Sequence, residues 1–306
     1  MEAAADGDRG ALARLLSVVE RGGEPARVVG RLTFPLAGAA YTVGMTGAPG
    51  AGKSTLNDRL IAVVRKAGGE VAVLAIDPSS PFSGGAILGD RVRMQEHALD
   101  PGVFIRSMAT RGHLGGLTLA TREAIRAVDA AGFPLVLLET VGVGQVEVEV
   151  AEAADTTVVV VNPGWGDSVQ ANKAGLLEIA DVFVINKADR PGAKETERDL
   201  QSMLAMSAPT DWVPPIVAAS ATAGEGIEAV WEAIESHRAH LAANGLLEAR
   251  RRDRLRDEVR EIVVRRLEED AYLRCSGPEF EALLERLRDR RIDPYGAAEE
   301  LISPPG

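Results

Sequence analysis

An α/β fold, with a mostly parallel sheet covered by helices on both faces, is predicted by three features of this 306-residue chain. Short apolar runs alternate with segments of helical periodicity between residues 40 and 242, a pattern typical of strand–helix–strand units. A glycine-rich loop joins the first apolar run to the helical segment after it. Beyond residue 244 the chain changes to long, charged helical segments with apolar stripes.

The apolar runs are the expected strands of this sheet. Ligands of open parallel sheets bind at the carboxyl ends of the strands, so functional residues are expected just after these runs. The expected strands are residues 41–46, 71–76, 103–106, 134–139, 157–161, 182–186 and 213–219.

Three regions are expected along the chain. Residues 1–39 form a helical extension, because Leu12, Leu15 and neighbouring apolar residues share one helical stripe. Residues 40–243 form the α/β domain. Residues 244–306 form a C-terminal helical region with one helix over about 246–270 and a second that starts near Pro278. Its apolar stripes either pack on the core or form a homodimerisation arm, and we favour the arm.

Residues 47–54 read Gly-Ala-Pro-Gly-Ala-Gly-Lys-Ser, which is the G-x-x-x-x-G-K-[ST] phosphate-binding loop. The run 41–45 before it and the helical spacing of Leu56, Leu60 and Val64 after it provide the strand–loop–helix context that this motif requires. Glycines allow backbone N–H groups to surround an anion, and the helix N-terminus favours negative charge. The sequence therefore predicts a P-loop NTPase.

Individual residues of this loop have expected roles. Lys53 is expected to reach the β- and γ-phosphates, the Ser54 hydroxyl to bind Mg²⁺, and Thr55 to bind the α-phosphate. A chance glycine-rich turn is the alternative, and the flanking strand and helix argue against it. The residues expected to hold the phosphates are Gly47, Ala48, Pro49, Gly50, Ala51, Gly52, Lys53, Ser54 and Thr55.

A second motif selects the base. Residues 186–189 read Asn-Lys-Ala-Asp after the apolar run 182–185, as in the N-K-x-D element of GTPases. A carboxylate at Asp189 would accept hydrogen bonds from N1–H and the 2-amino group of guanine, whereas adenine has no donors there. The Lys187 stem is expected along the purine face, and Asn186 is expected to tie this loop to the P-loop.

A third element follows the last expected strand. Ser220, Ala221 and Thr222 match the remaining guanine loop, where a backbone N–H would contact O6 of the base. A solvated turn explains Asn-Lys-x-Asp alone almost as well. The three elements in this order favour GTP and GDP over ATP.

Composition excludes several classes of function. The formal net charge of −11 argues against a surface for nucleic acid or anionic membranes. The single cysteine, Cys275, excludes an intramolecular disulfide and a cysteine metal cluster. The chain has no 18-residue apolar run and no signal-peptide pattern at its acidic N-terminus, so a cytoplasmic protein is expected.

Three carboxylates are candidate groups for a Mg²⁺ site. Glu139 begins Glu-Thr-Val-Gly142 where most small GTPases have D-x-x-G, and it could organise Mg²⁺ through a water while the Gly142 N–H binds the γ-phosphate. Asp77 and Asp90 bracket a Gly/Ser/Pro-rich loop, which suits a hard cation with oxygen ligands. The alternatives are a solvent-facing Glu139 and simple helix caps at the two aspartates.

Together these motifs resemble the MeaB/ArgK GTPases, the methylmalonyl-CoA mutase-associated G proteins. The resemblance extends over nearly the whole chain, and its long switch strings are more specific than the P-loop. It is carried by residues 47–55, 77–90, 111–116 (Arg-Gly-His-Leu-Gly-Gly), 139–145 (Glu-Thr-Val-Gly-Val-Gly-Gln), 186–189, 220–221 and 293–301.

The resemblance implies a chaperone for the adenosylcobalamin-dependent mutase. Such a protein gates cofactor loading by GTP binding and hydrolysis, protects or reactivates the mutase, and is a homodimer through its C-terminal helices. Asp77, Asp90 and Glu139 match the metal-site carboxylates of the family. Residues 165–173 match its third switch, in which Gln170 and Lys173 are expected to couple nucleotide to partner; ordinary polar residues at a helix start are the alternative.

One departure from other GTPases concerns catalysis. A glutamine directly after the D-x-x-G glycine often orients the attacking water. Here Val143 takes that position and Gln145 follows two residues later, so we expect slow hydrolysis that a partner accelerates. Arg111 is a candidate for stabilising transition-state charge, or else a structural or partner-contact residue. The residues expected to act in hydrolysis are Lys53, Glu139, Gln145 and Arg111.

Two other functions fit part of the sequence. A nickel-delivery GTPase also uses a Glu-x-x-Gly loop, but one cysteine and four scattered histidines make a poor metal-holding segment. His237 and His240, three apart on a helix, are predicted to be surface residues. A kinase of a transport protein that uses ATP would not need Asn-Lys-x-Asp. The client mutase is inferred from resemblance only, and isobutyryl-CoA or ethylmalonyl-CoA mutase would also fit.

Overall fold

The computed structural model describes residues 1–77, 97, 99–109, 116–140, 151–164, 178–206 and 211–302. The chain forms two compact units, Met1–Arg251 and Arg252–Gly306. Within the described ranges, no helix is both long enough and apolar enough to cross a membrane.

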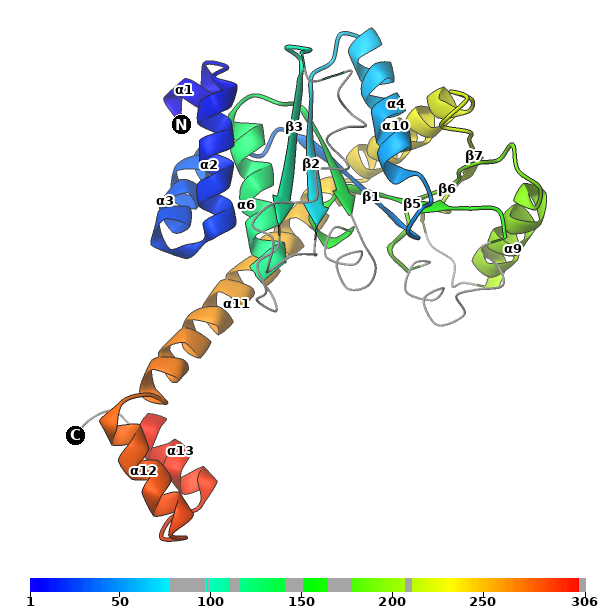
Figure 1. Cartoon of the computed structure of the whole chain (residues 1–306). Coiled ribbons are helices and arrows are strands. Elements are labelled where there is room, and N and C mark those ends of the chain that lie inside the picture. Colours follow the sequence, from blue (N-terminus) through cyan, green and yellow to red (C-terminus); the bar gives the residue numbers. More distant parts are fainter. Residues whose placement is uncertain are drawn as a thin grey trace. The chain divides into compact units, whose positions relative to one another are not determined.

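The first unit is built on a seven-stranded sheet in which all neighbouring strands are parallel (Figure 1). The strand order is β3-β2-β4-β1-β5-β6-β7. Strand β1 lies between β4 and β5, where the chain passes from one half of the sheet to the other, and such a point is where open sheets bind ligands. The strands are β1 (Tyr41–Gly47), β2 (Val71–Asp77), β3 (Val103–Ala109), β4 (Leu135–Thr140), β5 (Thr156–Val161), β6 (Val182–Ile185) and β7 (Ile216–Ala218).

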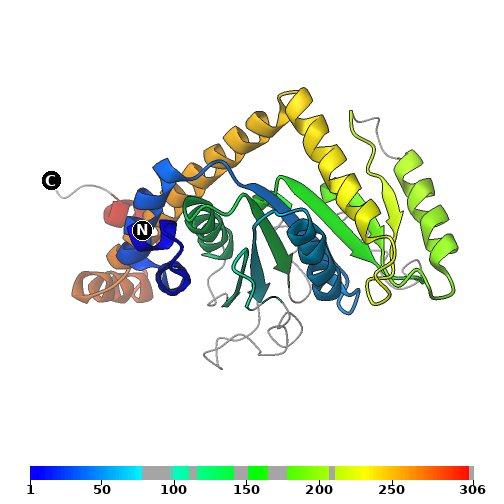
Figure 2. The same ribbon diagram turned by 90° about the horizontal axis from the view of Figure 1, so that it is seen from above.

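Helices cover both faces of this sheet, as predicted. The N-terminal helices lie beside α6 at the β3 end of the sheet, and α9 lies at the β7 end (Figures 1 and 2). The helices of this unit are α1 (Glu2–Ala5), α2 (Arg9–Arg21), α3 (Gly23–Thr33), the 3₁₀ turn η1 (Phe34–Leu36), α4 (Lys53–Lys66), α6 (Gly116–Ala130), α9 (Ala193–Met206), α10 (Ile227–Ala243) and the start of α11 (Leu246–Arg274).

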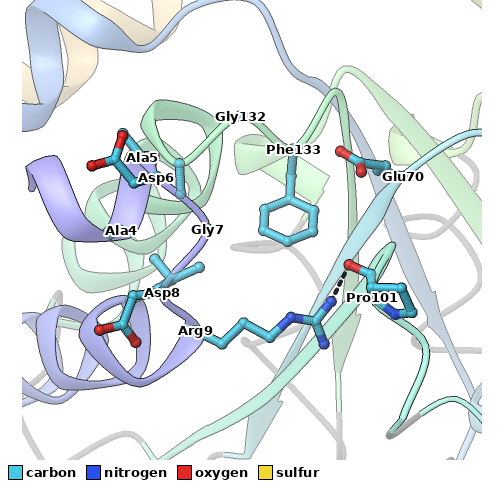
Figure 3. A pocket seen from close by; sticks show the side chains of 12 residues that line it. Ala4, Ala5, Asp6, Gly7, Asp8, Arg9, Glu70, Pro101, Gly132 and Phe133 are labelled. Carbon is cyan, nitrogen blue, oxygen red and sulfur yellow. Dashed lines mark hydrogen bonds between the residues drawn. The ribbon is translucent and has the colours of Figure 1, made fainter.

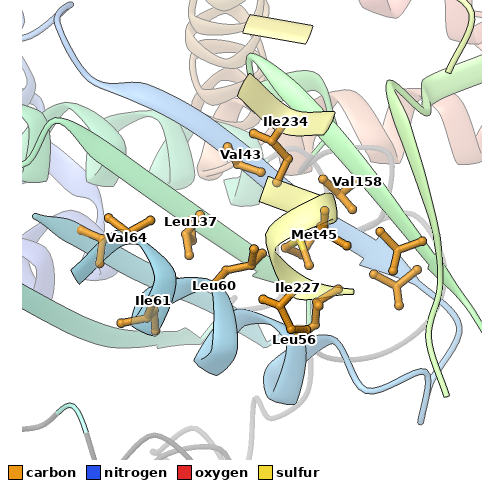
Figure 4. Packing of buried hydrophobic residues seen from close by; sticks show 14 of the residues in the cluster. Val43, Met45, Leu56, Leu60, Ile61, Val64, Leu137, Val158, Ile227 and Ile234 are labelled. Carbon is orange, nitrogen blue, oxygen red and sulfur yellow. The ribbon is translucent and has the colours of Figure 1, made fainter. Parts of the chain in front are cut away.

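The strands are apolar on both faces because each face packs against helices. Alternate residues of the strands, such as Val43 and Val158, pack against α4 and α10 on one face (Figure 4). The intervening residues, such as Leu74 and Leu138, pack against α2, α3 and α6 on the other face. Leu200 of α9 completes that second face over β5 and β6.

The N-terminal extension consists of three helices and a 3₁₀ turn, which lie within residues 2–36. Leu12, Leu16 and Val19 of α2 are fully buried against the sheet side of the extension, as expected. Helix α2 begins after Asp8, whose carboxylate caps it by accepting from the Ala11 N–H at 2.9 Å. Helices α1 and α3 add two further segments to the extension.

The last strand is shorter than predicted. The apolar run 213–219 suggests seven strand residues, but β7 comprises Ile216–Ala218 only. Pro214 and Pro215 precede it, and because proline has no N–H it cannot donate to the ladder. The expected strand start is therefore wrong by three residues.

His237 is buried, so the prediction of a surface histidine is wrong at this position. Its Nδ1 lies 2.8 Å from Thr156 Oγ1, and its Nε2 lies 3.2 Å from an Asp181 carboxylate oxygen. Both partners lie at the amino edge of the sheet, on or just before β5 and β6. Helical spacing places His237 on the face of α10 that packs on the sheet, together with Ile234 and Leu241.

The second unit continues α11 and adds α12 (Pro278–Arg288) and α13 (Pro294–Ile302). Helix α11 extends four residues beyond its expected end, and α12 starts at the expected proline. Arg286 and Glu300 form a two-pronged ion pair of 2.6 and 2.9 Å that joins α12 to α13. Large apolar side chains are exposed on α11 within this unit: Leu255, Val259, Val263, Val264, Leu267, Tyr272 and Leu273.

Candidate nucleotide-binding site

The loop after β1 has the backbone that a phosphate-binding loop requires. Gly47 has φ +126°, and a Cβ there would lie 2.0 Å from the Val160 carbonyl oxygen. Gly52 has φ +90°, and a Cβ there would lie 2.5 Å from the side-chain nitrogen of Asn186. Only glycine fits these two positions, because a side chain would meet both a steric clash and an unfavourable φ.

The first helical residue after this loop is Lys53, and α4 has no side-chain cap at Gly52. The first backbone N–H groups of a helix lack partners within the helix, so an uncapped N-terminus suits an anion. The ammonium of Lys53 is nearly buried and donates to the carbonyl oxygens of Gly47 at 2.7 Å and Ala48 at 3.3 Å. A cation is thus held inside the loop, where phosphate oxygens would meet it.

The carboxylate of Glu139 lies against the first turn of α4. Ser54 donates its hydroxyl hydrogen to Glu139 Oε1, and Asn57 donates from Nδ2 to Oε2 at 3.0 Å. Glu139 is 2% exposed on β4, in register with Met45 of β1. Two predicted Mg²⁺ ligands are therefore neighbours. Asn57 was not predicted, although its position three residues after Ser54 places both on one helical face.

Asn186 joins the loop after β6 to the P-loop, as predicted. Its side-chain N–H donates to the Ala51 carbonyl at 2.7 Å, while its Oδ1 accepts from the Ala221 backbone N–H at 3.1 Å. This buried side chain thus connects the three loops that are predicted to bind nucleotide. Lys187 reaches back in the same direction, because its Nζ donates to the Gly50 carbonyl at 2.6 Å. Its φ of +59° is a left-handed conformation that side chains rarely adopt, which points to a functional constraint.

Asp189 is presented as an ionised acceptor. Ser220 donates its hydroxyl hydrogen to Asp189 Oδ1 at 2.7 Å. This hydrogen bond, together with the nearby Arg190 and Lys187, holds the pKa of the Asp189 carboxyl below its ordinary value. A carboxylate that is ionised at neutral pH can accept the two hydrogens of a guanine edge. Thr222 is exposed in the turn just after Ala221.

Comparison with known proteins shows the family of this chain. The sequence model for "Methylmalonyl Co-A mutase-associated GTPase MeaB" matches residues 12–274. The chain belongs to the MeaB family of GTPases.

Relatives of this MeaB-family chain cover nearly its full length. A Pyrococcus abyssi protein described as a candidate GTPase is 51% identical over 97% of this chain and 93% of its own length. The GTPase ArgK of Escherichia coli is 37% identical over 85% of this chain and 83% of its own length. A crystal structure of a LAO/AO transport system kinase superposes with a TM-score of 0.70 at 27% identity, covering 98% of this chain and 94% of that one.

The side chains of several other predicted site residues lie outside the described structure. The backbone of Asp77 ends β2, in register with Ala109 at the end of β3, which is the edge of the sheet that carries the P-loop. The other positions lie outside the described residues: Asp90, Arg111, Gly142, Gln145, Gln170 and Lys173.

The described residues fit Mg²⁺ in part. Among them no group of three or more His, Cys, Asp or Glu side chains is placed to hold a metal. Mg²⁺, however, commonly uses one or two protein oxygens and completes its shell with phosphates and water. The adjacent oxygens of Ser54 and Glu139 meet that smaller requirement.

A pocket of about 360 Å³ lies away from these loops, between the N-terminal extension and the sheet (Figure 3). Its sheet side is formed by Glu70, Pro101 and Phe133, which precede β2, β3 and β4 and therefore mark the amino edge. Arg9 crosses it and donates to the carbonyl oxygens of Pro101 and, at 3.0 Å, Asp100. The arginine therefore fastens the extension to the sheet, at the edge opposite to the nucleotide loops.

Proposed function

We propose that this MeaB-family GTPase binds GTP with Mg²⁺ and uses its GTP state to control an adenosylcobalamin-dependent acyl-CoA mutase. The observation that carries the nucleotide assignment is the set of bonds at Asn186, which links the P-loop to the loops of Asp189 and Ser220. An ionised Asp189 matches guanine, and an adenine base would leave that charge without donors.

The chain's own residues divide the work of binding. Lys53 provides positive charge at the β- and γ-phosphates, and the α4 N-terminus provides backbone N–H groups. Ser54 and Glu139 would hold Mg²⁺, directly or through a water, with Asp77 and Asp90 as further proposed ligands. When bound, the metal would supply charge that stabilises the phosphates. The stem of Lys187, whose Nζ reaches back to the Gly50 carbonyl, is proposed to cover the purine face.

Hydrolysis is proposed to be slow in the isolated protein. Val143 occupies the position where many GTPases have a water-orienting glutamine, and valine cannot hydrogen-bond a water. Gln145, Arg111 or a group from a partner would then complete the site when the switches move. Rapid GTP turnover by the isolated chain at saturating GTP would contradict this proposal.

Methylmalonyl-CoA mutase is the proposed client, on the strength of the family description. We propose that the protein gates adenosylcobalamin loading and protects or reactivates the mutase, with Gln170 and Lys173 in the coupling switch. We also propose a homodimer through residues 244–306. The exposed apolar side chains of α11, including Val259 and Leu267, support it because they form a surface that a second copy could cover.

A kinase is the second candidate, because the matching crystal structure is described as that of a transport system kinase. The two functions differ in their nucleotide. Competition against bound GDP separates them: we expect GTP to displace GDP at micromolar concentration and ATP to fail. Equal displacement by ATP would reject the guanine assignment.

The client is tested by co-purification. A tagged chain is loaded with GDP or with a non-hydrolysable GTP analogue and mixed with purified methylmalonyl-CoA mutase. We expect a complex whose amount or affinity changes at least severalfold with the nucleotide. An Asp189→Asn chain, incubated with the same guanine nucleotides at a concentration that saturates only the unmodified chain, is the control and should lose that dependence. A mutase that never binds in any nucleotide state would contradict the client assignment and leave the GTPase assignment standing.

A further inference from the structure

We propose that Asn57 is a positioning residue for the Mg²⁺ site: it holds the Glu139 carboxylate against Ser54, and the cation affinity of the nucleotide complex depends on it. The inference rests on the proposed Mg²⁺-dependent function. It adds a residue that no part of the nucleotide motifs predicts.

The geometry is a clamp on one carboxylate. Ser54 and Asn57 lie three residues apart on α4, and each donates to a different oxygen of Glu139. Asn57 is 0% exposed and Glu139 is 2% exposed, so water does not compete freely for these bonds. Because Ser54 and Asn57 hold different oxygens, they set the plane of the carboxylate relative to the start of α4.

A glutamate at this position needs that second donor more than an aspartate would. Glutamate has one more rotatable bond than aspartate, so its carboxylate has more orientations to lose when it binds. A buried carboxylate is also costly unless hydrogen bonds replace its lost water. Asn57 provides such a bond to Oε2 and leaves Oε1 facing Ser54.

Packing alone does not explain an asparagine at this position. Residue 57 lies on the buried side of α4 between Leu56 and Leu60, where a leucine would bury more apolar area. The amide oxygen Oδ1 of Asn57 is also buried, and none of the described residues donates a hydrogen bond to it. A buried polar group with an unsatisfied atom is unfavourable for stability, which points to a role at the site.

The test measures Mg²⁺ binding to the GDP complex of the full chain by calorimetry. Asn57→Leu is expected to weaken Mg²⁺ binding about tenfold, because one hydrogen bond to a charged group is lost. GDP affinity measured in EDTA should stay within about twofold, because Asn57 makes none of the nucleotide-loop bonds. Asn57→Ala, which removes the donor without adding apolar bulk, should give the same loss and covers the case in which Asn57→Leu fails to fold.

Two controls separate positioning from general stability. Thr121→Val on α6 removes another buried polar group whose oxygen has no hydrogen bond within the described structure, far along the chain from the loops, and should leave Mg²⁺ affinity unchanged. In a Glu139→Gln background, Asn57→Leu should cause no further loss, because its effect is exerted through Glu139.

Three outcomes would overturn the inference. Unchanged Mg²⁺ affinity in both Asn57 variants would remove Asn57 from the site. An equal loss in the Glu139→Gln background would show that Asn57 does not act through Glu139. A wild-type chain that binds GDP without any dependence on Mg²⁺ would overturn both this inference and the proposed function.

Discussion

The two edges of the central sheet both hold charged and polar groups, but they use them differently. At the amino edge, the buried Asp155 pairs with Arg251 at 2.7 Å, and Asp181 lies 3.2 Å from both Arg250 and His237. At the carboxyl edge, Lys53 donates to the backbone carbonyls of Gly47 and Ala48, and Asp189 accepts from the Ser220 hydroxyl.

We interpret the charged groups of the amino edge as stabilising the fold and those of the carboxyl edge as available for binding. Opposite charges from distant segments pair permanently at the amino edge, and they fix α10 and the start of α11 to β5 and β6. Hydrogen bonds to neutral groups, such as these at the carboxyl edge, would be exchanged for bonds to a ligand at little loss of free energy. Ion pairs therefore stabilise the amino edge of the sheet, and the carboxyl edge is the one suited to exchange of ligands.

The largest expected effect comes from breaking the amino edge. Asp155→Ala removes an acceptor of Arg251 and of the Thr42 N–H, and should lower the free energy of unfolding by about 3 kcal/mol because a partly buried arginine loses its carboxylate partner. Urea unfolding measures this, and GDP affinity per folded molecule should not change. Glu285→Ala breaks the exposed pair with Arg288 and serves as the control, with a loss under about 1 kcal/mol. Equal losses in the two variants would contradict the comparison.

A smaller effect is expected from changing the carboxyl edge. Asp189→Asn should weaken GDP binding by roughly 30-fold, or about 2 kcal/mol, because the amide cannot accept both guanine hydrogens. The free energy of unfolding should change by less than about 1 kcal/mol, since Asp189 is not a core group. Fluorescent-nucleotide titration gives the affinity. Xanthosine diphosphate has a carbonyl in place of the 2-amino group and should bind the variant better than GDP does; a continued preference for GDP would refute the assignment of Asp189.

The smallest expected effect is on the pH dependence of the free energy of unfolding. Burial raises the pKa of the Asp181 carboxyl, but His237 and Arg250 lower it more, so the net pKa lies below the ordinary value of 3.8. A lowered carboxyl pKa stabilises the fold above the unfolded-state pKa, and this stability is lost as pH falls through the folded-state pKa. The free energy of unfolding should therefore fall below about pH 4. Asp181→Asn should show a shallower acid decline in chemical-denaturation curves; an unchanged slope would exclude Asp181 as a source.

Features that depend on a short, continuous stretch of chain were the ones that the sequence could predict. Gly47–Ser54 and Asn186–Asp189 are motifs whose backbone requirements are local, and Asn186 makes the predicted link between them. The all-helical extension and the parallel sheet also follow from hydrophobic periodicity. The start of β7 was wrong because two prolines interrupt an otherwise apolar run.

Asn57 and His237 show what periodicity could not reveal. From sequence alone, an asparagine or histidine on a helix is predicted to be exposed. Its burial becomes evident once the strand that it faces is known. Glu139 is 82 residues from Asn57, and Thr156 is 81 residues from His237. The glycine-rich loop and the α/β class could be predicted from the sequence, because local backbone chemistry and hydrophobic period specify both. The pairing of buried polar groups could be seen in the folded structure alone, because those contacts join segments that lie far apart in the chain.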